Sequence, residues 1–438
     1  MTFTIHRGAN EIGGSCVEVC TETTRLVLDI GMPLVNPDKT PFDTKEIESL
    51  SADELVKKGI LPNIPSLYQD NSKTAVLISH SHQDHYGLIN YINPSCPVYI
   101  GAVTQLMIET LNLFTNKNWS IKKPRRFEHG KKFKIGDIEI TPYLMDHSAF
   151  DSYAFLIEAD RKSLLYSGDF RLHSRNDNSF NYFRENIRKE IDYMFLEGST
   201  LGRPDTKYPS ETELEEQFIE TFKQTKGINL IFTSGQNIER LTTIYNACTQ
   251  CGKIFLIDFY TANILKMVHN KGNKNTPFAS SSFPEIKIYY PTRLTDRMMK
   301  KKKQKELIFP FVKYKIGKDK IKDMIEKLVM LVRPGMQFDL ERYLHNYTNG
   351  CFIYSLWKGY IYQNSRTKEF MDFIENKGIP VKYIHTSGHA DLDGLKKIVG
   401  IVKPKNIVPI HTYESEKYPD LFNGNNIFKA EDKEKYQA

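Results

Sequence analysis

Several features of membrane, secreted and fibrous proteins are missing from this 438-residue chain. It has six cysteines, too few for the disulfide framework of a small secreted protein, so we expect a reducing, cytoplasmic location. No apolar run reaches the roughly 18 residues that cross a bilayer, and we expect no membrane partner. The first residues lack a basic region followed by an apolar core, so we expect no signal peptide. Repeats and low-complexity tracts are also missing, which indicates a folded globular protein.

The positive charge is modest. Sixty Lys and Arg residues against 53 acidic residues give a net charge of +7, which permits a polyanionic partner without requiring one. The basic residues gather in two places, at Lys300–Lys303 with Lys305 and at Lys122–Arg126. Taken alone, such runs are more often solvated surface loops than binding sites.

The pattern of short apolar runs changes along the chain. Residues 25–31, 74–79 and 162–169 are each apolar and end in polar residues, as buried strands do. After residue 200, Ser210 and Glu213 have the spacing of a helix capping box, and strands then alternate with helices. A last strand-like run at 406–410 is similar to the first part. We therefore expect the middle of the chain to be an inserted α/β unit.

The most informative segment is 79–85, with the sequence SHSHQDH. It places His80, His82, Asp84 and His85 directly after an apolar strand. Imidazole and carboxylate suit a divalent transition metal such as zinc. Ligands this dense in a turn cannot all converge on one tetrahedral ion, so two adjacent ions explain them better than one.

Isolated histidines and aspartates end other predicted strands. These are Asp29, His147, Asp169 and His411. Each alone would more often be structural. Together with the dense segment, they indicate a metal site assembled from several strand ends.

These residues resemble the metallo-β-lactamase fold, and within it the β-CASP nucleases and RNase J-like proteins. Further matches occur in the same order along the chain. Residues 8–13 (GANEIG) are similar to the opening turn of that branch, 197–200 (EGST) to its motif A, 385–389 (HTSGH) to its motif B and 409–411 (PIH) to its motif C. The segment 355–360 (SLWKGY) departs from the bacterial RNase J form.

The resemblance implies an αββα sandwich, of the α/β class, with an inserted β-CASP domain. Residues 1–200 would form the first part of the metallo-β-lactamase domain, 201–389 the β-CASP domain, and 390–438 the C-terminal part of the first domain.

The resemblance also implies a role for each matching residue. One zinc ion would be held by His80, His82 and His147, and a second by Asp84, His85 and His411. Asp169 would bridge the ions, and Asp29 would orient the ligand histidines. His389 would act on the scissile phosphate or the leaving oxygen, with Glu197 holding it.

Substrate contacts are expected on either side of this centre. His385 and Ser387 would bind a neighbouring phosphate. Asn237 and Arg240 resemble a turn that contacts the substrate backbone, although a simple capped helix start explains them equally well.

The implied function is a di-zinc hydrolase, with manganese as an alternative metal, that cleaves single-stranded RNA. The form of residues 385–389 favours 5′-exonuclease action, with endonucleolytic cutting left open. A DNA-directed nuclease is the main alternative, and a small-molecule metallo-hydrolase of the same fold is a weaker one. His411 favours RNA over DNA. Either a monomer or a homodimer is compatible with the sequence.

Overall fold

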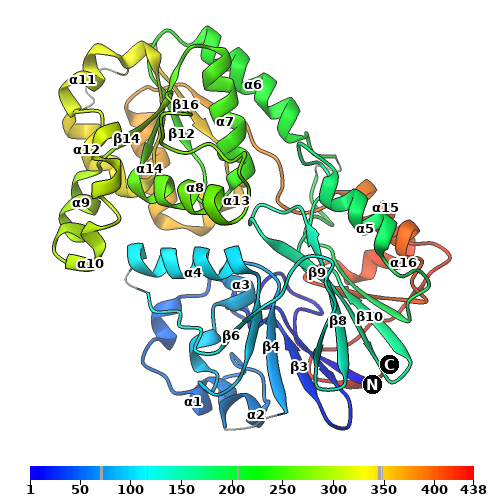
Figure 1. The fold of residues 1–438 in the computed structure, drawn as a ribbon. Coiled ribbons are helices and arrows are strands. Elements are labelled where there is room, and N and C mark those ends of the chain that lie inside the picture. Colours follow the sequence, from blue (N-terminus) through cyan, green and yellow to red (C-terminus); the bar gives the residue numbers. More distant parts are fainter. Residues whose placement is uncertain (70–72, 116, 205–206, 344–346, 348) are drawn as a thin grey trace.

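The computed structural model describes the whole chain except residues 70–72, 116, 205–206, 344–346 and 348. Its strands form three sheets (Figure 1). Two of them face each other across a shared apolar core, to which both contribute residues such as Leu26, Leu77, Phe155 and Phe195. The third sheet lies above them with helices of its own. Among the described residues, no helix is both long and apolar enough to cross a membrane.

The first sheet has the strand order β20, β1, β2, β3, β4, β5, β6. The bounds are β1 Thr2–Arg7, β2 Cys16–Cys20, β3 Arg25–Leu28, β4 Thr74–Ile78, β5 Val98–Ile100, β6 Pro124–Arg126 and β20 Lys435–Gln437. Strands β3 to β6 are parallel to one another. All five residues of β4 are buried, as expected for a central strand covered on both faces.

The second sheet has the order β19, β18, β11, β10, β9, β8, β7. The bounds are β7 Phe133–Ile135, β8 Ile138–Met145, β9 Ser152–Ala159, β10 Lys162–Tyr166, β11 Tyr193–Glu197, β18 Asn406–Ile410 and β19 Asn426–Ile427. β11 pairs in parallel with both β10 and β18. The chain therefore leaves this sheet after Glu197 and returns to it at Asn406.

Helices cover the outer faces of the two facing sheets. On the first sheet they are α1 Ala52–Lys57, α2 Pro65–Tyr68, α3 Gln83–Tyr86 and α4 Ala102–Thr115. On the second they are α5 Asn178–Asn186, α15 Leu392–Val402 and α16 Tyr418–Leu421. The predicted αββα sandwich is confirmed.

The third sheet is entirely parallel, in the order β14, β13, β15, β12, β16, β17. The bounds are β12 Asn229–Phe232, β13 Ile254–Asp258, β14 Ile286–Tyr289, β15 Leu328–Leu331, β16 Cys351–Tyr354 and β17 Val381–Tyr383. Its helices are α6 Glu211–Gln224, α7 Ile238–Gln250, α8 Phe259–Lys271, α9 Thr292–Met299, α10 Lys302–Lys305, α11 Lys318–Asp323, α12 Gln337–Tyr343, α13 Gly359–Gln363 and α14 Ser365–Asn376.

Helix α6 begins as the sequence predicts. The Ser210 hydroxyl accepts a hydrogen bond from the Glu213 amide at 3.2 Å, and the Glu213 carboxylate accepts from the Ser210 amide at 2.6 Å. Leu214, Phe218 and Phe222 follow on one face and are buried. This apolar stripe docks the helix on the third sheet.

Helix α4 belongs in sequence to the first sheet but packs against the third unit. It contacts α8, and the Phe114 ring meets the Tyr260 ring at 4.9 Å in an edge-on arrangement. Val103, Met107 and Phe114 share one apolar core with residues of the third sheet. α4 therefore joins the sandwich to the inserted unit.

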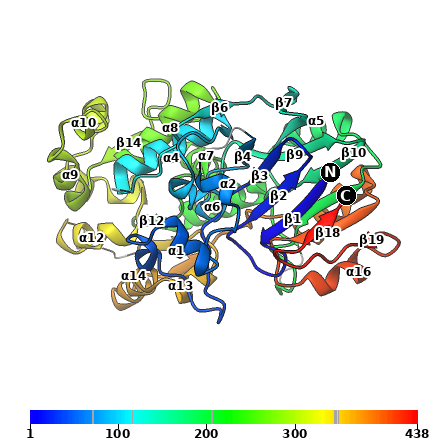
Figure 2. The same cartoon turned by 90° about the horizontal axis from the view of Figure 1, so that it is seen from below.

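The two chain ends lie side by side. The Ala438 amide donates to the Met1 carbonyl at 3.1 Å, and β20 pairs antiparallel with β1 (Figure 2). The last strand therefore extends the first sheet rather than starting a new element.

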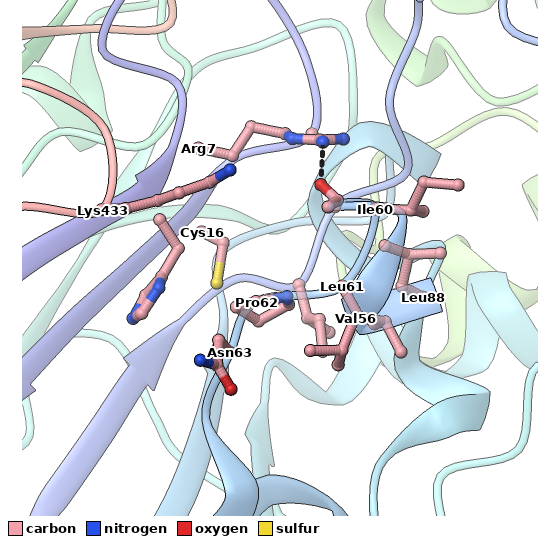
Figure 3. Close-up of a pocket in the computed structure, with 14 residues that line it drawn as sticks. Arg7, Cys16, Val56, Ile60, Leu61, Pro62, Asn63, Leu88 and Lys433 are labelled. Carbon is pink, nitrogen blue, oxygen red and sulfur yellow. Dashed lines mark hydrogen bonds between the residues drawn. The ribbon is translucent and has the colours of Figure 1, made fainter. Parts of the chain in front are cut away.

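Of residues 32–71, to which the sequence assigns no chemistry, residues 32–69 are described and pack against the first sheet. Arg7 on β1 donates to the Gly59 carbonyl at 2.6 Å and pairs with Glu11 at 3.1 Å. Beneath this contact lies a cavity of about 370 Å³ with an apolar wall that includes Ile60 and Leu61 (Figure 3). Arg7 thus holds the segment in place, and Glu11 neutralises the charge of Arg7.

Candidate metal centre

The dense histidine segment follows β4 at its carboxyl end. His80 and His85 are buried, and His82 immediately precedes α3, which carries Asp84 and His85. Asp84 and His85 are therefore neighbours on this short helix, close to His82. The parallel neighbour β3 ends beside it, and Asp29 follows β3 directly.

Three other predicted residues meet this loop from the second sheet. His147 follows β8, Asp169 follows β10 and His411 follows β18. β10 and β18 both lie parallel to β11, so their carboxyl ends point to the same edge. His411 has a φ of 51° and Asp29 a φ of 60°. Such left-handed backbone is strained for side chains other than glycine and is often found at functional sites.

The side chains form three groups, and within each group the potential ligand atoms lie within 4.8 Å of one another. The first group contains His80, His82 and His147, and the second contains Asp84, His85, Asp169 and His411. A third group shares Asp169 and His411 with the second and adds Glu197 and His389. The structure therefore brings together all seven residues that the sequence marks as candidate ligands.

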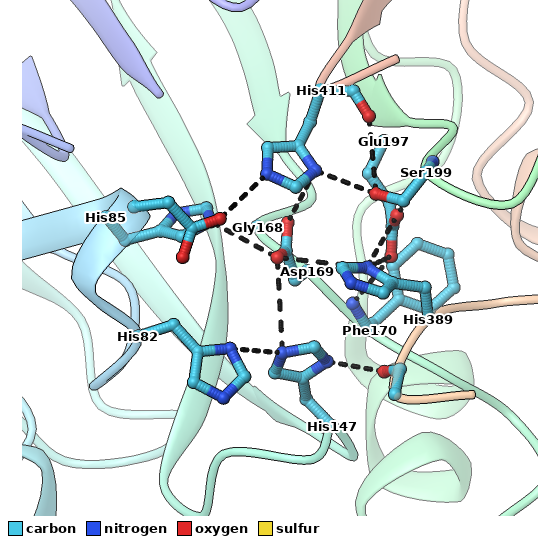
Figure 4. Close-up of polar contacts among 12 residues, drawn as sticks. His82, His85, His147, Gly168, Asp169, Phe170, Glu197, Ser199, His389 and His411 are labelled. Carbon is cyan, nitrogen blue, oxygen red and sulfur yellow. Dashed lines mark hydrogen bonds and ion pairs between the residues drawn. The ribbon is translucent and has the colours of Figure 1, made fainter. Parts of the chain in front are cut away.

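Asp169 lies where the first two groups meet (Figure 4). Its Oδ2 atom is 3.1 Å from Nε2 of His85, 3.8 Å from Nε2 of His80 and 4.0 Å from Nε2 of His147. Its Oδ1 atom is 3.6 Å from Nδ1 of His411. One carboxylate thus faces both groups.

The first group fits a divalent transition-metal ion. Nε2 of His80 is buried without a hydrogen-bond partner among the described residues. Nε2 of His147 faces Nδ1 of His82 at 3.1 Å. Burial lowers the pKa of His82 to about 4, and burial together with His82 and His389 lowers the pKa of His147 well below its usual value. Neutral imidazoles whose ring nitrogens converge are the donor set that zinc prefers.

The second group fits such an ion through its carboxylates. Burial alone would raise the pKa of Asp84, but His85 and His411 together lower it below the usual value. His411, His85 and His389 likewise outweigh the burial of Asp169 and lower its pKa. Both carboxylates are therefore ionised and available as ligands.

Asp29 contacts one of the candidate ligand histidines, His85. Nδ1 of His85 donates to its Oδ2 atom at 2.7 Å, which turns Nε2 of His85 toward Asp169. The Ser79 hydroxyl and the Tyr166 hydroxyl donate to the same carboxylate at 2.7 and 2.8 Å. A buried carboxylate that fixes the ring nitrogen of a ligand is common around protein metal sites. Sequence reasoning missed Ser79 and Tyr166.

Two further contacts orient His147 and His411. Nδ1 of His147 contacts the Gly388 carbonyl at 2.5 Å, and Nδ1 of His411 contacts the Ser199 hydroxyl at 2.7 Å. Both partners come from segments far away in the sequence. Ser199 lies in the 197–200 motif, but nothing in its spacing singles it out from its neighbours.

Glu197 and His389 form a pair at the edge of the cluster. Nδ1 of His389 lies 3.0 Å from Oε2 of Glu197 and 3.8 Å from Oδ2 of Asp169. Burial lowers the pKa of His389, but Glu197 and Asp169 outweigh it and raise the pKa above its usual value. The pair brings a proton-carrying side chain to the metal cluster.

His385 and Ser387 lie on the turn that leads to His389. The Ser387 hydroxyl accepts from the His389 amide at 3.0 Å. Nδ1 of His385 is buried and has no hydrogen-bond partner in the described chain. Burial and the nearby Arg240 charge lower the pKa of His385 to about 3, so its ring is neutral.

Asn237 and Arg240 are engaged inside the protein. The Asn237 side chain accepts from the Arg240 amide at 3.1 Å and caps α7. The Arg240 guanidinium is fully buried and contacts both carboxylate oxygens of Glu211, at 3.0 and 2.9 Å. The structure thus contains the capped helix start that the sequence left open. Because Arg240 is fully buried, its guanidinium has no access to a substrate.

A buried arginine that the sequence did not single out links the two parts of the chain. Arg171 follows β10 and pairs with Asp146, Glu239 and Glu211. Its Nη1 also donates to the Ser387 carbonyl at 3.3 Å. Arg171 therefore ties the turn of His389 to the edge of the second sheet.

Comparisons with known proteins agree with this geometry. Residues 58–233 match a model described as a β-lactamase superfamily domain, and residues 378–418 match one described as a Zn-dependent metallo-hydrolase RNA specificity domain. The first match contains the histidine segment, His147, Asp169 and Glu197, and the second contains residues 385–389 and His411. Residues 58–233 therefore form a β-lactamase superfamily domain, and the chain as a whole is similar to RNase J-like proteins.

Relatives of this RNase J-like chain differ in length. Ribonuclease J of Helicobacter pylori is 24% identical over 429 residues, which cover 92% of this chain and 55% of that protein. The chain thus spans about half the length of that relative. The RNase J-like protein of Methanocaldococcus jannaschii is 25% identical over 449 residues and is covered to 95%. A crystal structure of a protein of unknown function from Enterococcus faecalis has the same fold, with a TM-score of 0.75, 20% identity and 99% coverage of both chains.

Proposed function

We propose that this chain is a metal-dependent ribonuclease that removes nucleotides from the 5′ end of single-stranded RNA. One observation carries the proposal. The first two groups of candidate ligands adjoin at Asp169, and His389, which belongs to neither of them but shares the third group with Asp169 and Glu197, lies beside that residue. A phosphodiesterase needs this combination of charge neutralisation and a separate proton donor.

The candidate ligands of the two ions are those of the first two groups. His80, His82 and His147 would hold one ion, Asp84, His85 and His411 the other, and Asp169 would contact both. Zinc suits the imidazole-rich set, with manganese as the alternative. When bound, two such ions supply an activated water and neutralise the charge that develops on the phosphoryl oxygens.

His389 has the position of a proton donor to the leaving oxygen. Its Nδ1 atom is engaged by Glu197, which leaves Nε2 to face the substrate. An alkoxide is a poor leaving group unless it is protonated, and an imidazole can supply that proton. The histidines that bind metal cannot, because their nitrogen lone pairs are committed to the ions. Glu197 is then a positioning residue that sets the orientation of the His389 ring.

A 5′-phosphate site next to the metal centre favours exonuclease action. His385 offers a buried ring nitrogen with no hydrogen-bond partner in the described residues, and the Ser387 hydroxyl lies on the same turn. A neutral imidazole and a hydroxyl both donate hydrogen bonds to phosphate oxygens. Binding of a terminal phosphate here would place the next phosphodiester at the metals.

Aromatic side chains near the centre favour a nucleic-acid substrate. The Arg203 guanidinium lies over the Trp357 ring, 5.0 Å from its centroid, and Tyr360 meets the same ring at 5.4 Å. Desolvation and the Asp84 carboxylate raise the pKa of Tyr360, although about half of this side chain is exposed to solvent. Aromatic and guanidinium planes of this kind stack on unpaired bases.

Cleavage of end-labelled oligonucleotides tests the proposal. Zinc-loaded protein is incubated with 5′-labelled RNA and DNA of one sequence, with and without EDTA, and with Asp84→Ala as the inactive control. Release of labelled mononucleotide from RNA alone, abolished by EDTA, is the expected result. Preferential cleavage of DNA would favour the DNA-directed alternative, and internal RNA fragments without mononucleotides would favour endonucleolytic cutting. No cleavage of either polymer would contradict the nuclease proposal.

A further inference from the structure

A cavity of about 400 Å³ lies between the end of α4 and the third-sheet unit. Leu111 and Phe114 of α4 form one side, and residues of α8 and α9 and the segment around Arg333 form the other. The cavity lies outside the metal cluster, and the proposed mechanism does not use it.

One wall of the cavity is a guanidinium held over an aromatic ring. The Arg333 guanidinium lies over the Tyr260 ring at 5.2 Å, and the Tyr260 ring meets the Phe114 ring edge-on at 4.9 Å. Arg333 is held in this position by Asp258 at 2.9 Å and by the Thr261 hydroxyl at 3.0 Å. Tyr260 and Phe114 are buried, whereas Arg333 is partly exposed, and a fixed guanidinium plane of this kind suits the face of a nucleobase.

The rim of the cavity is positively charged. Arg293 and Arg297 are exposed, lie one turn apart on α9 and line the opening. Asp258 neutralises Arg333, whereas neither Arg293 nor Arg297 forms an ion pair within the described part of the chain. The Arg297 guanidinium also donates to the Phe114 carbonyl, and the Arg293 guanidinium lies 5.2 Å from the centroid of the Phe338 ring. Two guanidinium groups held at the rim without an ion pair match a phosphate attached to a base.

Helix α4 gives the distance from this cavity to the metal loop. The Ser81 hydroxyl, between His80 and His82, lies 3.8 Å from the sulfur of Met107 on α4. Phe114 is seven residues further along, which corresponds to about 10 Å at 1.5 Å per residue. That distance spans about two to three nucleotides of a strand that keeps the stacked rise of roughly 3.4 Å per nucleotide. In Figure 1, α9 and α10 lie on the left, whereas α15, which follows His389, lies on the right.

We propose that this cavity binds one nucleotide of the RNA strand, two to three positions downstream of the scissile phosphate. Its base lies against the Arg333 guanidinium, and its phosphate is bound by Arg293 and Arg297. This inference rests on the proposed function and adds a second point of attachment, apart from the turn that carries His385. The site recognises base and phosphate without reading sequence, because stacking accepts every base.

Equilibrium binding tests the site independently of cleavage. Binding of a fluorescent 12-nucleotide RNA is measured in EDTA over a range of salt concentrations, for the wild type and for Arg293→Gln and Arg297→Gln. Arg184→Gln on α5 is the matched control, because Arg184 is also exposed and lies away from the cavity. The cavity variants are expected to bind several-fold more weakly, with the salt slope reduced by about one. The control is expected to match the wild type.

RNAs that each lack one base locate the site along the strand. For the wild type, removal of the base two to three positions downstream of the cleavage site should weaken binding about fivefold or more. In Arg293→Gln the same removal should have a smaller effect, because the two changes act on one nucleotide. AMP is added as a competitor, to distinguish a polymer subsite from a site for a free nucleotide.

The outcomes separate the two proposals. Wild-type affinity and salt slope in both arginine variants, or equal sensitivity to base removal at every position, would overturn the subsite. Strong AMP binding that requires Arg293, with unchanged RNA binding, would also overturn it. RNA binding that depends on Arg293 without any cleavage in zinc would support the subsite and contradict the nuclease proposal alone. Melting temperatures equal to the wild type verify that the variants are folded.

Discussion

Nδ1 of His389 lies 3.0 Å from the Glu197 carboxylate, although the two residues are 192 positions apart in the chain. Glu197 ends β11 in the sandwich, and His389 follows the last strand of the third sheet. The pair therefore spans the junction between the two parts of the protein. The proposed mechanism depends on this pair, because it assigns His389 as the proton donor to the leaving oxygen.

Removal of the imidazole should slow the chemical step without removing metal. We expect His389→Ala to lower single-turnover cleavage of RNA by about 10²–10⁴-fold, the range typical of a general acid. Zinc content and melting temperature should stay at wild-type values. Loss of zinc in this variant would make His389 a ligand instead, and a wild-type rate would eliminate its catalytic role.

Glu197→Gln provides a finer test of the same pair. The amide cannot stabilise a charged imidazole as a carboxylate does, so His389 should lose its proton at lower pH, and we expect the alkaline limb of the pH–rate profile to move to lower pH while KM stays constant. A structural role alone would lower the melting temperature and leave the shape of the profile unchanged.

The metal content should depend on Asp84. Because its carboxylate belongs to only one of the two ligand groups, we expect Asp84→Ala to retain the ion held by His80, His82 and His147 and to lose the other. Elemental analysis should give about two zinc ions per wild-type chain and about one per variant chain. Equal content in both proteins would refute the assignment of two ions.

Gly31 should tolerate no side chain because of its position against the metal loop. A β-carbon at this glycine would lie 1.8 Å from the Asp84 carbonyl oxygen, which is main chain and cannot rotate away. We expect Gly31→Ala to displace Asp84 and to lower zinc occupancy and activity together. Gly400→Ala is the matched control, because nothing lies within 4 Å of the added atom. In helix α15 that change should stabilise the protein by about 0.5–1 kcal/mol.

The buried Glu211 should matter for stability. It contacts both Arg171 and Arg240, which are fully buried. Glu211→Ala leaves two buried cations without this partner and should lower the free energy of unfolding by about 3–5 kcal/mol. Glu216→Ala, on the exposed face of the same helix, should change it by less than about 0.5 kcal/mol. Similar values for both variants in urea unfolding would show that the network is not stabilising.

The same residue predicts a pH dependence. Burial alone would raise the pKa of Glu211, but Arg240 and Arg171 lower it from 4.5 to about 2. The folded state therefore binds this proton more weakly than the unfolded state. The stabilisation is complete above pH 4.5 and is lost as the pH falls toward 2. Unfolding free energies of the wild type and Glu211→Gln should converge across that interval.

The fold and the clustering of the candidate metal ligands could be predicted because their signals are local. Three histidines and an aspartate within six residues are rare by chance, and the other candidate ligands come within three residues of the ends of apolar strands. The capping box of α6 is equally local, since Ser210 and Glu213 satisfy each other within one turn.

The residues that support the site could not be predicted in this way. Ser199, Ser79 and Tyr166 are ordinary polar residues in sequence, and their importance arises from partners 50 or more positions away. The sequence left open whether Arg240 contacts the substrate or belongs to a capped helix start. It could not show that Arg240 is buried against Glu211, because that contact depends on the packing of two helices. Contacts between residues so far apart in the chain produce no periodic pattern in the sequence.

The dependence of RNA cleavage on zinc is the most direct test of the central claim. Metal-free protein is titrated with zinc, and release of labelled mononucleotide from 5′-labelled RNA is measured at each ratio of zinc to protein. We predict little cleavage up to one equivalent if the sites fill in sequence, and full activity near two equivalents. Full activity with one equivalent, or cleavage by the metal-free protein, would contradict a two-metal ribonuclease.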